Sequence, residues 1–152
     1  LLKNPDRFEF VIEKSVELGV SCIQPLITQN VINKTSDRTE RWRLIALAAM
    51  KQSQRCILPK VMSPLVFEDC INSADSLLKF IADERPSDNA VVPKDLAVIA
   101  ESVELYIGPE GGFTAEEVKY AGSKGFRILN LGPRKFRSET AAILGTGLLL
   151  SS

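Results

Sequence analysis

Histidine is absent from the 152 residues of this chain, and its absence narrows the chemistry that the chain can perform. A Ser-His-Asp triad, a Cys-His dyad and an imidazole general base all require histidine, so these mechanisms are excluded. Zinc sites built on imidazole ligands are excluded for the same reason. Any catalysis is therefore left to positioning, to arginine charges and to carboxylates.

Cysteines are few, and long apolar runs are missing. The three cysteines, Cys22, Cys56 and Cys70, are odd in number and widely spaced, which fits neither a disulfide framework nor a CxxC metal site. We interpret them as buried, reduced thiols of a cytoplasmic protein. No apolar stretch approaches the roughly 20 residues that cross a bilayer. We therefore expect neither a metal nor a membrane among the binding partners.

The composition is that of a globular domain, with 45% hydrophobic and 25% charged residues. One domain over residues 1–152 is the simplest division of a chain of this length. The chain begins with Leu1 rather than an initiator Met, and no signal-peptide pattern follows. We therefore expect an N-terminal portion to be missing from this sequence.

The net charge is zero, but the charges are segregated along the chain. Residues 1–60 carry ten basic and six acidic residues, and residues 111–152 carry six basic and three acidic residues. The stretch between them, 61–110, carries three basic and ten acidic residues. Because both ends of the chain are positive, the neutral total does not argue against a nucleic-acid partner.

Helical and strand patterns alternate at short intervals. We expect helices over 5–18, 37–54, 65–71, 114–124 and from 138 to the C-terminus, and strands over 22–27, 57–62, 77–82, 103–107 and 126–131. This alternation predicts an α/β fold with a parallel sheet covered by helices on both faces.

Local signals support several of these boundaries. Asn4-Pro5 is typical of a helix start and Gly19 of a helix end, and Pro25 predicts incomplete pairing within its strand. Capping-box spacing occurs at Asp37 with Glu40 and at Thr114 with Glu117. Trp42, Ile45 and Ala49 recur at helical spacing, which places them near one face of the helix. This favours core packing of Trp42 over stacking on a base.

Two loops follow predicted strands and carry the residues of greatest interest. The first, 108–112, reads Gly-Pro-Glu-Gly-Gly. Its three glycines leave the backbone open to a ligand ahead of a helix N-terminus. The Walker and dinucleotide-binding patterns are both absent, and Glu110 would repel phosphate. A tight strand-to-helix turn with no ligand remains an alternative for this loop taken alone.

The second loop, 132–137, places three cations in four residues, Arg134, Lys135 and Arg137, directly before a helix that Ser138 caps. Positive charge is unfavourable at a helix N-terminus, and Glu139 in the first turn offsets it. A solvated basic loop is the alternative interpretation. Ligands of parallel α/β sheets bind at the carboxyl ends of strands, so the two loops together predict a binding site there.

Several segments of the chain closely resemble the RsmE-type RNA methyltransferases. The resemblance covers nearly the whole chain and is carried by residues 105–113, 125–126 and 131–141, and upstream by 7–14, 17–20 and 52–55. It implies S-adenosylmethionine-dependent methylation of N3 of a uridine in 16S ribosomal RNA of the small subunit.

The resemblance also implies a fold and partners that the residue patterns do not supply. The implied fold is a SPOUT-type domain with a C-terminal trefoil knot, acting as a homodimer with its cofactor pocket at the knot. Proteins of this type also carry an N-terminal PUA-like RNA-binding domain, which we expect to be the missing portion.

Site residues follow from matching the family motifs to this sequence. The residues expected to bind the cofactor are Ile107, Gly108, Pro109, Glu110, Gly111, Gly112, Leu131, Gly132, Phe136, Arg137 and Thr140. Residues 81–84 are expected to form a third wall. Arg134 and Arg137 are expected to stabilise charge on the base, and Glu139 to orient an arginine or accept a proton. Arg7, Lys14, Lys51 and Arg55 are expected to contact RNA phosphates.

Two other functions remain open from the sequence. A ribose 2′-O-methyltransferase of the same superfamily is one, although the segment 137–141 departs from the Ser-Leu-Asn-like motif typical of those proteins. A non-catalytic RNA-binding or ribosome-assembly module is the other. The intact glycine loop and the set Arg134, Arg137 and Glu139 favour the base methyltransferase over both.

Overall fold

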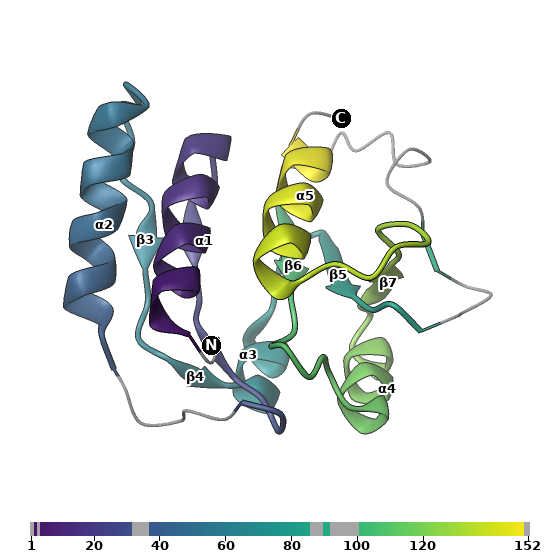
Figure 1. The fold of residues 1–152 in the computed structure, drawn as a ribbon. Helices are drawn as coiled ribbons and strands as arrows, with labels where there is room; N and C mark the ends of the chain where they lie inside the picture. Colours follow the sequence, from purple (N-terminus) through teal and green to yellow (C-terminus); the bar gives the residue numbers. More distant parts are fainter. Residues whose placement is uncertain (1, 3, 32–36, 86–89, 92–100, 151–152) are drawn as a thin grey trace.

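The structure is a computed structural model that describes residues 2, 4–31, 37–85, 90–91 and 101–150 (Figure 1). The elements in chain order are α1 (Pro5–Leu18), β1 (Cys22–Ile23), β2 (Leu26–Ile27), α2 (Thr39–Gln52), β3 (Lys60–Val61), β4 (Leu65–Val66), α3 (Phe67–Ser73), β5 (Leu78–Ala82), β6 (Val103–Tyr106), α4 (Ala115–Ser123), β7 (Arg127–Leu129) and α5 (Ser138–Leu150).

The strands that the structure describes all pair in parallel, as the alternating pattern predicts. The three-stranded sheet has the order β6-β5-β7. In it, Ile81 of the central strand β5 lies opposite Tyr106 of β6 and Ile128 of β7. The predicted single sheet is wrong in detail, because β1 pairs with β3 and β2 with β4 in two short sheets of their own. The carboxyl ends of β5, β6 and β7 thus meet at one edge.

Helices cover both faces of the sheet β6-β5-β7, which confirms that part of the prediction. Successive side chains of a strand point to opposite faces. Phe80 packs with Leu149 of α5, whereas Ile81 packs with Phe67 of α3 and Ala121 of α4. Figure 1 shows α5 and α4 on either side of these strands.

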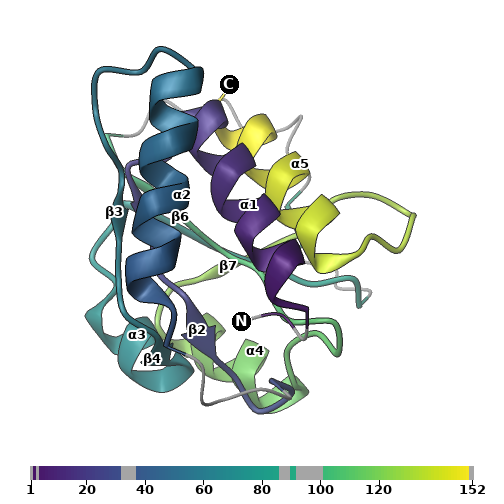
Figure 2. The same cartoon turned by 60° about the vertical axis from the view of Figure 1, so that its left-hand side comes forward.

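A separate core lies between α1, α2 and β3. Trp42 is only 2% exposed and meets Phe8 edge-on, with ring centroids 4.9 Å apart. Core packing is therefore confirmed as the role of Trp42, because a buried indole has no face free for a base. On its other side α1 lies along α5, so it joins the two halves of the fold (Figure 2).

Both predicted ends of α1 and the predicted capping box at the start of α4 are confirmed. The side chain of Asn4 accepts the N–H of Asp6, and Gly19 ends α1 with a φ of 111°, a conformation that favours glycine. Thr114 and Glu117 form the expected reciprocal capping box of α4.

The predicted capping box at the start of α2 is wrong. Asp37 accepts hydrogen bonds from both the N–H and the hydroxyl of Thr39, and the helix begins at Thr39. Glu40 instead pairs with Arg43 along the helix surface. A local side-chain bond between residues two apart therefore replaces the capping pattern.

Two smaller expectations also change. The predicted strand 22–27 is split at Gln24-Pro25 into β1 and β2, as proline within a strand indicates. Of the three cysteines only Cys70 is buried, so the expectation of buried thiols is wrong for Cys22 and Cys56.

Candidate functional site

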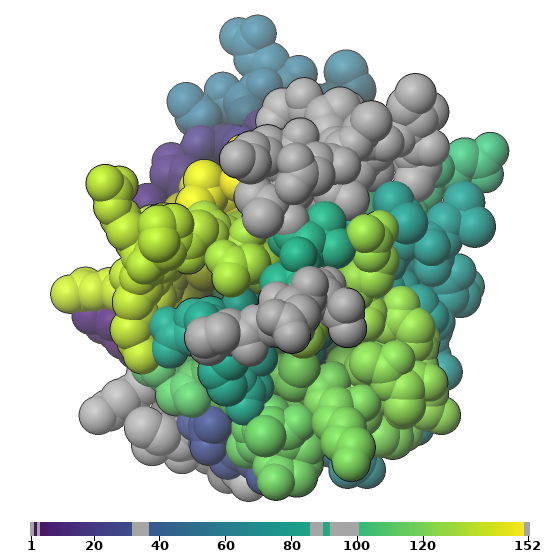
Figure 3. All heavy atoms as spheres, turned by 90° about the vertical axis from the view of Figure 1, so that its right-hand side faces the viewer, coloured from purple at the N-terminus to yellow at the C-terminus, as the bar shows by residue number. Residues whose placement is uncertain are grey.

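A pocket of about 520 Å³ opens at the carboxyl ends of β5, β6 and β7. Three loops line it, namely 82–85 after β5, 107–113 after β6 and 129–138 around and after β7, together with Ala141 of α5. Figure 3 faces this side of the molecule, where the yellow-green segment after β7 lies beside the teal segment after β5. The pocket is at the edge where the sequence predicts a ligand.

The loop after β6 is a tight turn with little side-chain cover. Gly112 has a φ of +66°, and its N–H donates to the carbonyl of Pro109 at 2.8 Å. A Cβ on Gly108 would lie 3.1 Å from backbone atoms of Gly112 and Phe113, so the turn closes directly on itself. Glycine is required at both positions, at Gly112 by conformation and at Gly108 by space.

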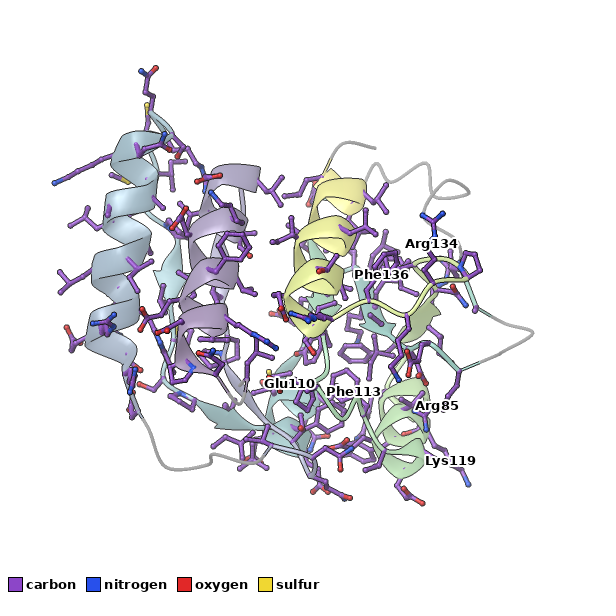
Figure 4. The ribbon with its side chains drawn as sticks, viewed as in Figure 1. Arg85, Glu110, Phe113, Lys119, Arg134 and Phe136 are labelled. Atoms are coloured by element: carbon purple, nitrogen blue, oxygen red, sulfur yellow. The ribbon has the colours of Figure 1, made fainter. Side chains whose placement is uncertain are left out.

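The loop after β7 bends at a second glycine with positive φ. Gly132 has a φ of +118°, and its N–H donates to Oδ1 of Asn130 at 2.8 Å. This asparagine turn leads the chain past Phe136 to the start of α5. In Figure 4 the rings of Phe136 and Phe113 and the side chain of Arg85 gather between α5 and α4. Leu131 and Phe136 give this side of the pocket its apolar wall.

The third wall is held by ion pairs. Arg85 donates from Nε to both carboxylate oxygens of Asp83, at 3.1 and 2.9 Å, and from Nη2 to the carbonyl of Thr114. The hydrogen bond to Asp83 raises the pKa of Arg85 above its ordinary value. Lys135 reaches across from the loop after β7 to Glu84, with Nζ 2.7 Å from Oε1. Both cations are therefore neutralised by neighbouring carboxylates.

Arg134 and Arg137 differ from these two cations. Both line the pocket and are exposed. Neither guanidinium makes a hydrogen bond or ion pair with any residue that the structure describes. They lie just before the N-terminus of α5, whose partial positive charge adds to theirs. The pocket mouth thus favours a ligand group that is negative or becomes negative during a reaction.

The structure brings nearly all of the expected site residues together. Every residue expected to bind the cofactor lines the pocket except Thr140, whose neighbour Ala141 does so. Residues 82–85 also line the pocket, one residue further along the chain than the expected third wall, 81–84.

Glu139 does not line the pocket, unlike the two arginines expected to act with it. Its Oε1 lies 3.7 Å from Nε of Arg7 on α1, and its side chain is 13% exposed. Its Oε2 is buried and has no hydrogen-bond partner within the part of the chain that the structure describes. Glu139 on α5, expected to be catalytic, therefore faces Arg7 on α1, expected to bind RNA.

The other residues expected to bind RNA are spread over the α1–α2 side. Lys14 lies between Glu13 and Glu17, whose hydrogen bonds raise its pKa. Lys51 is exposed in the last turn of α2. Arg55 donates to the carbonyls of residues 16, 19 and 20, so its guanidinium caps the C-terminus of α1. Arg55 thus has a structural role that the sequence did not indicate.

Sequence reasoning missed Asn130 and Arg85, which shape two of the three loops. Arg85 follows the predicted strand 77–82, and Asn130 lies near the end of the predicted strand 126–131. Polar residues at such positions were the available signal. Among the described residues, no three cysteine or acidic side chains gather to hold a metal ion. In the same ranges no helix has the length and apolar character to cross a membrane.

The sequence matches a known protein family over nearly its full length. Residues 1–150 match the family described as RNA methyltransferase domain. The chain belongs to this RNA methyltransferase family. The match includes the three loops that line the pocket, so the pocket lies within the family's own domain.

Curated relatives in the family carry a more specific name. The chain is 39% identical over 141 residues to ribosomal RNA small subunit methyltransferase E of Mesomycoplasma hyopneumoniae, which covers 90% of this chain and 60% of the relative. It is 31% identical over 144 residues to the protein of the same name from Aquifex aeolicus, covering 93% and 61%. The chain thus spans about three fifths of the length of these relatives.

Solved structures share the fold. A protein from Legionella pneumophila, in complex with the bound cofactor SAM, matches with a TM-score of 0.91 and 36% identity over 99% of this chain and 63% of its own. Ribosomal RNA small subunit methyltransferase E from Neisseria gonorrhoeae, bound to S-adenosyl methionine, matches with a TM-score of 0.89 and 31% identity over 99% and 62%. These matches confirm the parallel α/β fold. They also confirm the resemblance to RsmE-type RNA methyltransferases that the sequence motifs indicated.

Proposed function

We propose that the protein of which this chain is a part transfers a methyl group from S-adenosylmethionine to N3 of a uridine in 16S ribosomal RNA. The observation that carries this proposal is the pocket at the strand ends, which is lined by both motif loops and by two exposed arginines, Arg134 and Arg137. The names of the relatives support an RNA substrate in the small subunit. The cofactor bound to two structural neighbours supports the donor.

The residues of the pocket fit such a cofactor. No atom of the described residues beyond the chain neighbours lies within 4 Å of where a Cβ would be at Gly112 or Gly132, so the backbone of both loops is open to a ligand. We assign the adenosine and methionine parts to these loops, with Leu131 and Phe136 as apolar walls. When bound, the cofactor would supply an activated methyl group on a sulfonium. The chain's main contribution is to hold the base in line with that group.

The arginines supply the charge that the reaction needs. Loss of the N3 proton makes the uracil ring negative, and Arg137 with Arg134 would stabilise that charge in the pocket mouth. We propose that Glu139 orients Arg7, because Oε1 of Glu139 lies 3.7 Å from Nε of Arg7 and neither residue lines the pocket. Thr140 is assigned to the cofactor side of the helix start on the resemblance alone.

The RNA would lie across the side of the molecule formed by α1 and α2. Lys14 and Lys51 are exposed or half-buried cations on these helices and are our proposed phosphate contacts, with Arg7. Arg55 belongs to the family-like segment 52–55, and we propose that it serves RNA binding chiefly by fixing the end of α1.

We further propose the assembly that the resemblance implies. This comprises a SPOUT domain over 1–152, a C-terminal trefoil knot, a homodimer and a cytoplasmic location. Sedimentation equilibrium tests the dimer directly, since a mass of one chain at micromolar concentration would contradict it.

The product nucleoside tests the proposed function. In cells that lack the full-length protein, mass spectrometry of digested 16S ribosomal RNA should find one N3-methyluridine missing, and the gene should restore it. A missing 2′-O-methyl nucleoside would instead indicate the ribose methyltransferase. Unchanged nucleosides with reduced subunit assembly would indicate a non-catalytic module.

A further inference from the structure

The turn that follows β2 contacts the glycine loop of the pocket from outside. Nδ2 of Asn30 donates to the carbonyl of Gly111 at 3.1 Å and to that of Gly112 at 3.0 Å. Asn30 is about eighty residues away in sequence and does not line the pocket, whereas both glycines do. In Figure 2 the dark-blue segment after β2 lies beside the green segment that precedes α4. One amide group therefore holds two successive carbonyls of the pocket loop.

The two segments are also matched in shape. A Cβ added to Gly111 would lie 3.1 Å from Cβ of Asn30, which is tighter than ordinary van der Waals contact. Glycine at this position thus lets Asn30 approach closely enough to reach both carbonyls.

A buried carboxylate fastens the same turn to α4. Oε1 of Glu117 accepts the N–H of Gln29 at 2.9 Å, and Oε2 accepts the N–H of Thr114 at 2.8 Å. Glu117 is 6% exposed, so these two bonds are shielded from water. Asn30 is therefore held in place by its neighbour Gln29.

We propose that Asn30 is a positioning residue that fixes the glycine loop in the shape that receives the cofactor. The inference rests on the proposed function. Gly112 has a left-handed φ and a glycine before it, so many other backbone conformations are open to the loop. With the carbonyls of Gly111 and Gly112 held by Asn30, the loop is ordered before the ligand arrives. Binding then costs less conformational entropy, which is how preorganisation raises affinity.

The isosteric variant Asn30→Asp tests this role in the full-length protein. It keeps the size of the side chain but replaces the donor by a carboxylate, which two carbonyl oxygens repel. We expect calorimetry to give a dissociation constant for S-adenosylmethionine about tenfold above that of the wild type, roughly 1.4 kcal/mol. The KM for the cofactor should rise about tenfold while kcat at saturating cofactor and the KM for RNA stay within twofold.

The matched control is Asn72→Asp. Asn72 lies in α3 and accepts the Tyr120 hydroxyl through Oδ1, an acceptor that aspartate retains. This control should bind cofactor like the wild type. If Asn30→Asp does not fold, Asn30→Ala carries the same expectation, because it removes the donor without adding charge.

The outcomes separate this inference from the proposed function. A wild-type protein that binds no S-adenosylmethionine rejects the proposed function, and with it this inference. A wild type that binds, with an Asn30 variant whose cofactor affinity is within twofold, rejects the positioning role alone. Equal rises in KM for cofactor and RNA would also reject it, since they would indicate a general structural defect.

Discussion

The carboxylate of Glu117 allows the contribution of one buried residue to be worked out from the structure. It accepts two backbone N–H groups, from Gln29 and Thr114, and is 6% exposed. A hydrogen bond to a charged group contributes about 1.5–3 kcal/mol, and an unsatisfied buried donor adds to the loss. Glu117→Ala removes both bonds at once. We expect it to lower the free energy of unfolding by about 3 kcal/mol.

Urea denaturation followed by circular dichroism measures this loss, and the melting temperature gives a second estimate. For a chain of this size each kcal/mol corresponds to about 2–4 °C, so the melting temperature should fall by about 6–12 °C. Glu116→Ala is the control, because Glu116 is exposed in the same helical turn. Equal stability of the two variants would refute the reasoning, since it would mean that the buried bonds contribute nothing beyond an exposed charge.

Three further predictions concern other parts of the chain. Gly108→Ala places a Cβ 3.1 Å from backbone atoms and should abolish cofactor binding in calorimetry, and normal binding by this variant would contradict the geometry of the turn. Gly122→Ala, where no described residue beyond the chain neighbours and the helix backbone comes within 4 Å of the added Cβ, should raise the free energy of unfolding by about 1 kcal/mol. Arg41 lowers the pKa of Glu9 below its ordinary 4.5, so the stability that this pair contributes is present above that pH and is lost as pH falls through the lowered pKa. Glu9→Gln should therefore unfold more readily than the wild type at pH 7 and equally at the acid end, and a difference independent of pH would show that the charge is irrelevant. Arg55→Ala should lower the melting temperature by several degrees because α1 loses its cap, and an RNA-binding loss with unchanged melting would contradict that role.

The pocket was predictable because its residues are determined by local rules. Glycines and polar residues after buried strands indicate a strand-end site, and parallel strands bring those ends to one edge. The T-x-x-E pattern at Thr114 likewise predicted a helix start that the structure confirms. Every residue that the family motifs assigned to the cofactor then lines the pocket except Thr140, whereas Arg85 and Asn130 line it without having been assigned.

The contacts that were missed depend on residues far apart in the sequence. Arg55 caps a helix that ends 37 positions earlier, at Leu18, and Asn30 holds a loop that lies 81 positions later, at Gly111. No spacing rule links such pairs, because their proximity follows from the packing of whole elements. The capping box predicted at Asp37 was wrong for a different reason. Asp37 had two local hydrogen-bond patterns available, the capping box and the bond to Thr39, and the second one formed.

The central claim is that the loops after β6 and β7 hold S-adenosylmethionine. A crystal structure of the chain grown with S-adenosylmethionine tests it most directly. We expect cofactor density in contact with residues 107–112 and 131–137, with the methyl group directed toward Arg134 and Arg137. Density at another surface, or an empty pocket at saturating cofactor, would contradict it.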